Sequence, residues 1–302
     1  MIQKHTWNKE TWVDIDRGTP EELDAIVNEY DIDPFVAKEI GSPTPKSRIE
    51  FHKDYIYLIL HFPVFKHTHT KKLKQEIDFV IGKNFLLTIR YDTIDALHKL
   101  SKELEVEEIL SKNNDASGHH VFGILFRELY SSINEELAYI ESWSESITDD
   151  IFNGQEKEMV FEISEAIRTL LEFRKTTDSH KEILEFLKDG GGHILGQKFT
   201  EEIDAILLEY HRLRDIIHAN IDILRELRET NNSLLSTTQN ETIKTLTVLA
   251  FITLPLTFIS GLFAMDVITP FHDNLYGFYI ILGFMIFVAL CMYTIARIKK
   301  WL

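Results

Sequence analysis

The stretch Ile243–Met265, IKTLTVLAFITLPLTFISGLFAM, decides the fold class, because Lys244 is its only charged residue. As a helix it would extend about 35 Å, enough to cross the hydrocarbon core of a bilayer. A second stretch, Leu275–Ala296 (LYGFYIILGFMIFVALCMYTIA), has no charge and carries Tyr276 and Tyr279 at one end, as is typical of an interfacial anchor. The alternative is a buried hairpin of a soluble protein, whose helices would alternate apolar with polar positions. The sequence therefore predicts two membrane-spanning helices.

Basic residues precede the first predicted span and follow the second. They are Arg225, Arg228, Arg297, Lys299 and Lys300. Residues 266–274, between the spans, contain no lysine or arginine. By the positive-inside rule both termini are cytosolic and residues 266–274 form a short external loop. The chain opens with polar residues, so we expect no cleavable signal peptide and a location in the cytoplasmic (inner) membrane.

The composition excludes several classes of function. The net charge of −16, from 48 acidic and 32 basic residues, has the wrong sign for binding nucleic acid through the whole body. The single cysteine, Cys291, allows neither an intrachain disulfide nor a cysteine zinc site within one chain. Walker, G-x-G-x-x-G, H-E-x-x-H and G-x-S-x-G motifs are absent. We expect no enzyme and no cofactor; the expected partners are membrane lipid, metal cations and copies of the chain.

Residues 1–117 are predicted to form a cytosolic α/β layered domain. Strands are indicated by β-branched and aromatic content at residues 11–16, 47–53, 55–62, 75–82 and 84–91. Helices are predicted at residues 20–30 and 33–41, each with proline in its opening turn. Loops are predicted at residues 41–45 and 112–118 from their composition.

Residues 118–198 predict a long helical hairpin. One helix runs from about His120 to Ile151, a turn at Asn153-Gly154 reverses the chain, and a second helix runs from about Glu156 to Leu187. We expect residues 190–192, three consecutive glycines, to break that second helix.

A single helix is predicted from about Phe199 to Met265, since no proline lies between Phe199 and Leu254. It comprises a stalk helix at residues 199–242 and transmembrane helix 1 at 243–265, roughly 100 Å in all. Transmembrane helix 2 (275–296) and a basic tail (297–302) complete the chain. Such a helix cannot pack adequately on one chain's two spans, so we expect an oligomer around the first span.

One face of the first span is smaller and more hydroxylated than the rest. At about 100° per residue, this face comprises Asn240, Ile243, Thr247, Ala250, Leu254, Thr257 and Gly261. Leu249, Phe251, Ile252, Phe258 and Phe263 lie away from it. Small residues serve both close helix packing and pore lining, and the periodicity does not separate the two.

Several motifs resemble the CorA family of magnesium transporters. They are Thr245–Ala250 (TLTVLA), Leu254–Gly261 (LPLTFISG), Tyr276-Gly277-Phe278 and the terminal Lys299–Leu302. The likeness extends over essentially the whole chain, including the predicted α+β membrane architecture. It implies a homopentamer whose stalk helices line a central pore for a divalent cation, with Mg²⁺ as the first candidate and Zn²⁺ or Co²⁺ as others. Carried over by position, Asn240, Ile243, Leu246, Leu254 and Thr257 fall in the pore lining, the apolar ones at a hydrophobic gate that blocks a hydrated ion by dewetting.

The chain departs from this family at the outer mouth, where Ala264-Met265-Asp266 replaces Gly-Met-Asn. The family's asparagine offers neutral amide oxygens to Mg²⁺, an ion that dehydrates reluctantly. Asp266 would instead form a ring of carboxylates that captures cations strongly. This departure leaves two alternatives open: proton-coupled transport of Zn²⁺ or another transition metal, as in the ZntB branch, and a non-conducting membrane scaffold or signalling protein.

The family's regulatory acidic site between cytosolic domains is not evident. The corresponding strand end reads Lys66-His67-Thr68-His69, and Asp204 is the nearest candidate for the partner acid. His67 and His69 would project to one side of a strand, as a metal pair or as a solvated loop edge. Four acidic residues cluster near the predicted hairpin tip, as a solvated turn or a cation-concentrating rim. They are Asp149, Asp150, Glu156 and Glu158.

Overall fold

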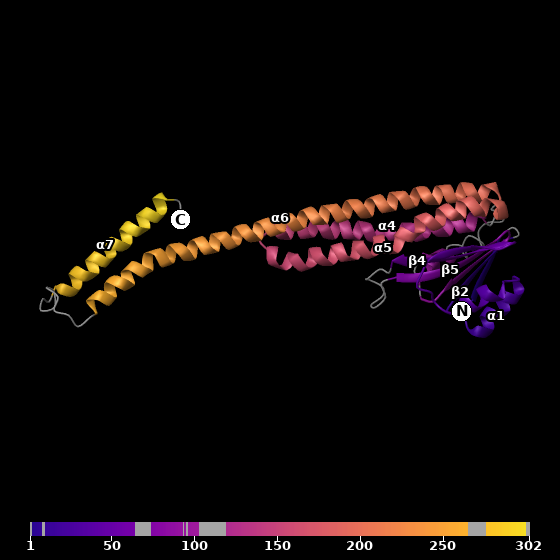
Figure 1. Cartoon of the computed structure of the whole chain (residues 1–302), viewed down its shortest axis with the longest axis horizontal. Coiled ribbons are helices and arrows are strands. Elements are labelled where there is room, and N and C mark those ends of the chain that lie inside the picture. Colours follow the sequence, from indigo (N-terminus) through magenta and orange to yellow (C-terminus); the bar gives the residue numbers. More distant parts are fainter. Residues whose placement is uncertain are drawn as a thin grey trace. The chain divides into compact units, whose positions relative to one another are not determined.

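A computed structural model describes residues 2–7, 10–63, 74–92, 94, 96–102, 119–264 and 276–299. The chain divides into two compact units, residues 1–228 and 229–302. Figure 1 shows the sheet and three long helices in the first unit, and the C-terminal helix in the second.

The first unit is built on a six-stranded sheet of order β1-β2-β6-β5-β4-β3. The strands are β1 (Ile2–Trp7), β2 (Glu10–Asp16), β3 (Arg48–Phe51), β4 (Tyr55–Pro63), β5 (Lys74–Gly82) and β6 (Phe85–Arg90). Neighbours are antiparallel except β2 and β6, which are parallel. The five predicted strands are confirmed as β2 to β6. The edge strand β1 was not predicted, because its sequence IQKHTW is mostly polar.

Side chains of the interior strand β4 alternate between two apolar cores. Ile56, Leu58, Leu60 and Phe62 belong to the core shared with the long helices. Tyr55, Tyr57 and Ile59 belong to a core with α1 (Pro20–Glu29) and α2 (Pro34–Glu39) on the other face. This two-residue period is what a strand buried on both faces requires. The predicted α/β layers, and the prolines in the first turns of both helices, are confirmed.

The long helices of the first unit are α4 (His119–Phe152), α5 (Glu156–Leu195) and the N-terminal part of α6 (Gln197–Phe263). A turn at residues 153–155 joins α4 to α5, and Gly154 adopts φ +87° there, a conformation that glycine permits. Figure 1 shows the three helices running side by side over one face of the sheet. The predicted hairpin and its turn are confirmed.

The predicted helix break at the three glycines is wrong. Residues 190–192 are helical, and the chain reverses only at Gly196, with φ +97°. Close packing explains these glycines: a Cβ at Gly190 would lie 2.4 Å from the Phe51 ring, and one at Gly191 would lie 2.6 Å from the ring of Phe199. Tertiary contacts of α5 therefore override the low helix propensity of the triplet.

Gly191→Ala is expected to lower the unfolding midpoint of the protein, because the fully buried Phe199 cannot yield to the added methyl group. Overpacking of this kind costs about 1–3 kcal/mol. Gly123→Ala in α4 is the matched control: its Cβ would meet Glu202 at 3.6 Å, an ordinary contact. The control should be neutral or stabilising by up to about 1 kcal/mol from helix propensity. Thermal unfolding monitored by tryptophan fluorescence measures both, and a midpoint that falls equally in both variants would refute the packing explanation.

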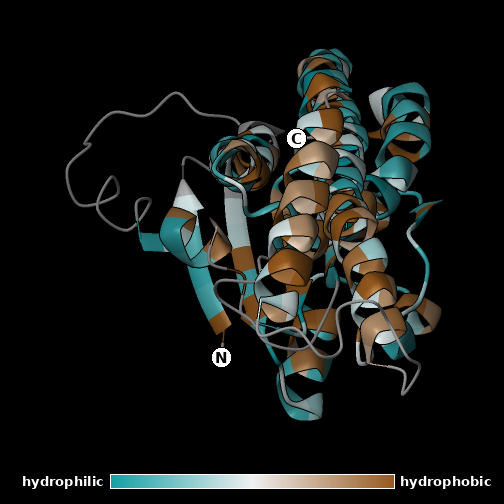
Figure 2. Ribbon diagram, turned by 90° about the vertical axis from the view of Figure 1, so that its left-hand side faces the viewer, coloured by the Kyte–Doolittle hydropathy of each residue, from teal (hydrophilic) through white to brown (hydrophobic). Residues whose placement is uncertain are grey.

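The second unit contains the membrane half of α6 and helix α7 (Gly277–Ile298). α6 is 67 residues long, which confirms the predicted continuous helix with each end two residues earlier. Both helices contain a stretch long and apolar enough to cross a membrane. In Figure 2 the helix that ends at the C mark is predominantly brown, the colour of hydrophobic residues.

Candidate ion pathway along the first membrane helix

The face of α6 that the sequence singled out, together with the adjacent Leu246 that the family resemblance added, is exposed in the single chain. Ile243, Leu246 and Leu254 are 61%, 65% and 69% exposed. The other members of the set are exposed as well: Asn240, Thr247, Ala250, Thr257 and Gly261. Because large exposed apolar surfaces mark contact with lipid or protein, this face requires a cover that its own chain does not provide.

The opposite face of the same stretch is partly covered. Val248 is 5% exposed, and a set of half-buried residues follows at helical spacing. These are Phe251, Ile252, Pro255, Leu256 and Ile259. At 100° per residue, the centre of this covered set lies about 150° from the centre of the exposed face. Figure 1 shows α7 running beside this stretch of α6. One side of this helix is thus packed within its own unit, and the candidate face remains exposed.

Two threonines give the candidate face acceptor oxygens. The hydroxyl of Thr247 donates to the carbonyl of Ile243 at 2.7 Å, and that of Thr257 donates to the carbonyl of Thr253 at 2.9 Å. Because each hydroxyl proton is engaged by the helix backbone, each oxygen can interact further only as an acceptor, through its two lone pairs. Such a surface suits a cation or its hydrating water.

The described part of the face carries no charge. Glu241 and Lys244 are its nearest charged neighbours on α6, and both lie at least about 100° from its centre. The structure describes the chain as far as Ala264 and again from Tyr276, so Met265 and Asp266 of the predicted outer mouth lie outside the described residues. Lys299 follows the end of α7 and is described, whereas Lys300 is not. The described pathway therefore consists of apolar side chains, two hydroxyl oxygens and the amide of Asn240.

Those of the remaining candidates that lie among the described residues show no metal site. Asp204 forms an ion pair with Lys188 at 2.7 Å. The hydrogen bond to Asp204 raises the pKa of Lys188. The carboxylate of Asp204 is therefore already paired with a lysine of the same chain. Within the described ranges no cluster of three or more His, Cys, Asp or Glu residues could hold a metal ion. At the hairpin tip the carbonyls of Asp149 and Asp150 accept backbone hydrogen bonds from the turn, as in a structural turn. His67 and His69 lie outside the described residues.

The architecture defines a class of protein: a two-span membrane protein in which a long helix runs from an α/β domain into the first span and leaves an uncharged, acceptor-bearing face open. The pattern of the CorA-like Mg²⁺ transporter protein family matches residues 7–300, and the chain belongs to this family. The predicted α+β membrane fold and the prediction of a divalent-cation transport protein rather than an enzyme are thereby confirmed.

Relatives share the architecture along most of their length. The cobalt/magnesium transport protein CorA of Thermotoga maritima is 24% identical over 300 residues, covering 97% of this chain and 83% of the relative. The complete structure of the CorA magnesium transporter from Methanocaldococcus jannaschii has a TM-score of 0.83 at 21% identity, covering 100% of this chain and 98% of that one. The ZntB cytoplasmic domain from Vibrio parahaemolyticus has a TM-score of 0.62 at 11% identity, covering 78% and 91%.

Proposed function

We propose that this protein conducts Mg²⁺ passively down its electrochemical gradient through a homopentameric pore in the cytoplasmic membrane. The pore is lined by the candidate face of α6, from Asn240 to Gly261, and both termini lie in the cytosol. The observation that supports this proposal most directly is the position of that face, which is exposed and lies about 150° from the half-buried side of the same helix.

The proposed mechanism assigns separate tasks along the pathway. Asp266 captures the cation at the outer mouth, and the oxygens of Thr257 and Asn240 contact its hydration shell. Leu254, Leu246 and Ile243 form the gate, since rings of apolar side chains exclude water until they widen.

An oligomer is also supported by the stalk part of α6. Leu208, Ile216 and Ile223 are exposed apolar residues that lie within about 80° of one another on the helix. These side chains are left uncovered by their own chain, and a neighbouring copy would bury them. That the proposed oligomer contains five copies of the chain follows from the family resemblance.

Transport of Zn²⁺ coupled to protons is the second candidate function. It is favoured by the replacement of Gly-Met-Asn by Ala-Met-Asp, because a carboxylate can titrate and an amide cannot. The fold shared with a ZntB cytoplasmic domain is compatible with it.

Asp266→Ala is expected to reduce Mg²⁺ uptake into proteoliposomes about tenfold or more, because the pore entrance loses its carboxylates. A tenfold reduction in rate corresponds to an activation barrier higher by about 1.4 kcal/mol. Asp273→Ala, an acidic residue elsewhere in the same loop, is the control and should transport normally. Uptake of Mg²⁺, Co²⁺, Zn²⁺ and Na⁺ is measured at two external pH values. Zn²⁺ entry driven by a proton gradient would favour the second candidate, and no flux of any ion from an intact oligomer would contradict both.

A further inference from the structure

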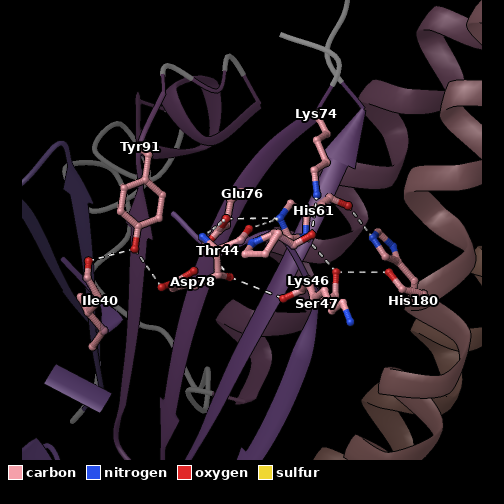
Figure 3. Close-up of polar contacts among 12 residues, drawn as sticks. Ile40, Thr44, Lys46, Ser47, His61, Lys74, Glu76, Asp78, Tyr91 and His180 are labelled. Carbon is pink, nitrogen blue, oxygen red and sulfur yellow. Dashed lines mark hydrogen bonds and ion pairs between the residues drawn. The ribbon is translucent and has the colours of Figure 1, made fainter. Parts of the chain in front are cut away.

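The first unit contains a cavity of about 550 Å³ that the transport proposal does not use. It lies where the segment after α2, the adjoining ends of β4 and β5, and the middle of α5 meet (Figure 3). Its lining consists of Pro45, Lys46, Ser47, His61, Lys74, Glu172, Lys175, Thr176 and Ser179. Cavities of this size accommodate small organic molecules.

The charge of this cavity is opposite to that of the chain. Three lysines face one acidic residue in the lining, whereas the protein carries a net charge of −16. Lys46 and Lys175 are exposed and have no ion pair among the residues that the structure describes. The Nζ of Lys74 donates to the carbonyl of Pro45 at 2.8 Å, which holds this ammonium group at the cavity. The surplus of positive charge therefore remains available to a ligand.

A row of hydrogen-bonded side chains forms one wall of the cavity. The Ser179 hydroxyl donates to Ser47 Oγ at 3.2 Å, and Ser47 Oγ lies 2.9 Å from His61 Nδ1. On its other side, His61 Nε2 lies 2.9 Å from the Thr44 carbonyl and 3.2 Å from Glu76 Oε2. Figure 3 shows this row of hydrogen bonds running from α5 to β5. His61 is only 4% exposed, so the wall is a buried and fixed part of the site.

A second buried histidine fixes α5 against β4. His180 Nε2 donates to the His61 carbonyl at 2.7 Å, while Nδ1 lies 3.1 Å from the Tyr130 hydroxyl. Burial lowers the pKa of His180 to about 4, so this ring is neutral at physiological pH and contributes structure rather than charge.

The acids behind the wall do not cancel the positive charge of the cavity. Burial tends to raise the pKa of Glu76, but hydrogen bonds from His61 and Thr44 outweigh it, so this carboxylate is ionised and already paired. Burial and the neighbouring Glu76 raise the pKa of Asp78 to about 8, so Asp78 is mostly protonated at neutral pH. The remaining acid at the cavity is Glu172, which the lysines outnumber.

We propose that this cavity binds a small phosphate-bearing molecule. Lysine ammonium groups are compact point charges that serve widely as phosphate ligands. Thr176 adds a hydroxyl that has no hydrogen bond within the described part of the chain. A cation is the less suitable ligand, since Glu172 is the single acid in the lining of the cavity, against three lysines.

Inorganic pyrophosphate is the probe that tests this site on the purified full-length protein in nanodiscs of neutral lipid. At constant ionic strength it should raise the unfolding midpoint of the wild type, because a ligand that binds only the folded state stabilises it. Lys175→Glu and Lys46→Glu should each weaken pyrophosphate binding about tenfold or more, as hydrogen bonds to charged groups are strong. Lys181→Glu, also on α5 but outside the cavity, makes the same change in charge and should bind within about twofold of the wild type.

Each outcome decides the proposal. The site is supported if the two cavity variants lose pyrophosphate binding and Lys181→Glu retains it. An effect of pyrophosphate that arose from chelation of divalent cations would instead persist in all variants. The proposal is overturned if pyrophosphate stabilises none of the proteins, or if Lys175→Glu and Lys46→Glu bind as the wild type does. Nanodiscs with anionic lipid but no pyrophosphate separate the two sources of phosphate, since stabilisation there that Lys175→Glu abolishes identifies a lipid headgroup. These binding measurements are independent of whether the protein transports ions.

Discussion

Leu254→Asn is expected to raise the resting cation flux of the reconstituted protein about tenfold or more, which corresponds to a barrier lower by about 1.4 kcal/mol. Leu254 is 69% exposed on the candidate face of α6, where the proposed pore places a ring of leucines. An apolar constriction blocks hydrated ions because water leaves it, and an amide side chain of similar size would keep the ring wet. Ion flux into proteoliposomes, measured while the ion gradient is held constant, gives the resting leak.

Leu249→Asn is the matched control for this prediction. Leu249 is 59% exposed and lies five residues away on the same helix, but about 140° around it from Leu254. The same substitution there makes the same change in hydropathy and side-chain volume without touching the proposed pore. Equal leak in both variants would indicate general damage to the membrane helices, and no leak in either would count against a gate at Leu254.

The membrane helices were predictable because their signals are local. A long uncharged run defines each span, and the absence of proline between Phe199 and Leu254 predicted the continuous helix that is observed as α6. Helical periodicity also predicted the candidate face. The sequence did not indicate whether that face packs within the chain or remains open, because that depends on where α7 lies, and no periodicity in α6 encodes its partner.

Features that depend on distant residues were not predictable. The three glycines of α5 have low helix propensity, but their close contacts with Phe51, Phe199 and Thr200 keep them helical. The cavity brings together Ser47 and Ser179, which are 132 residues apart in the chain. One signal was present: His61 interrupts the otherwise apolar strand YIYLILHF, and a buried polar side chain needs partners.

A buried ion pair within the sheet, between Asp14 and Arg90, leads to the prediction with the largest effect on stability. Asp14 on β2 is 1% exposed and Arg90 on β6 is 4% exposed. Arg90 Nη2 and Nε lie 3.0 and 3.1 Å from Asp14 Oδ2, and the Thr88 hydroxyl donates to Asp14 Oδ1 at 2.7 Å. The pair thus joins β2 to β6, which are parallel neighbours in the sheet.

Arg90→Ala is expected to destabilise the first unit by about 3–5 kcal/mol, because it leaves the Asp14 carboxylate buried without its counter-charge. For a unit of this size the unfolding midpoint should fall by about 10 °C. Thermal unfolding monitored by tryptophan fluorescence is a direct measure, since Trp12 Nε1 donates to Thr88 Oγ1 at 3.0 Å within the same network.

The double variant Asp14→Leu/Arg90→Met separates the value of the ion pair from the penalty of an unpaired charge. Replacing both charges by apolar side chains of similar volume removes the buried carboxylate as well, so most of the lost stability should return. Lys4→Ala provides the scale for an exposed pair, because Lys4 and Glu29 are about half exposed and their interaction is worth at most about 1 kcal/mol. If the double variant were as unstable as Arg90→Ala, the ion pair itself, and not the relief of an isolated charge, would account for the stability that joins β2 to β6.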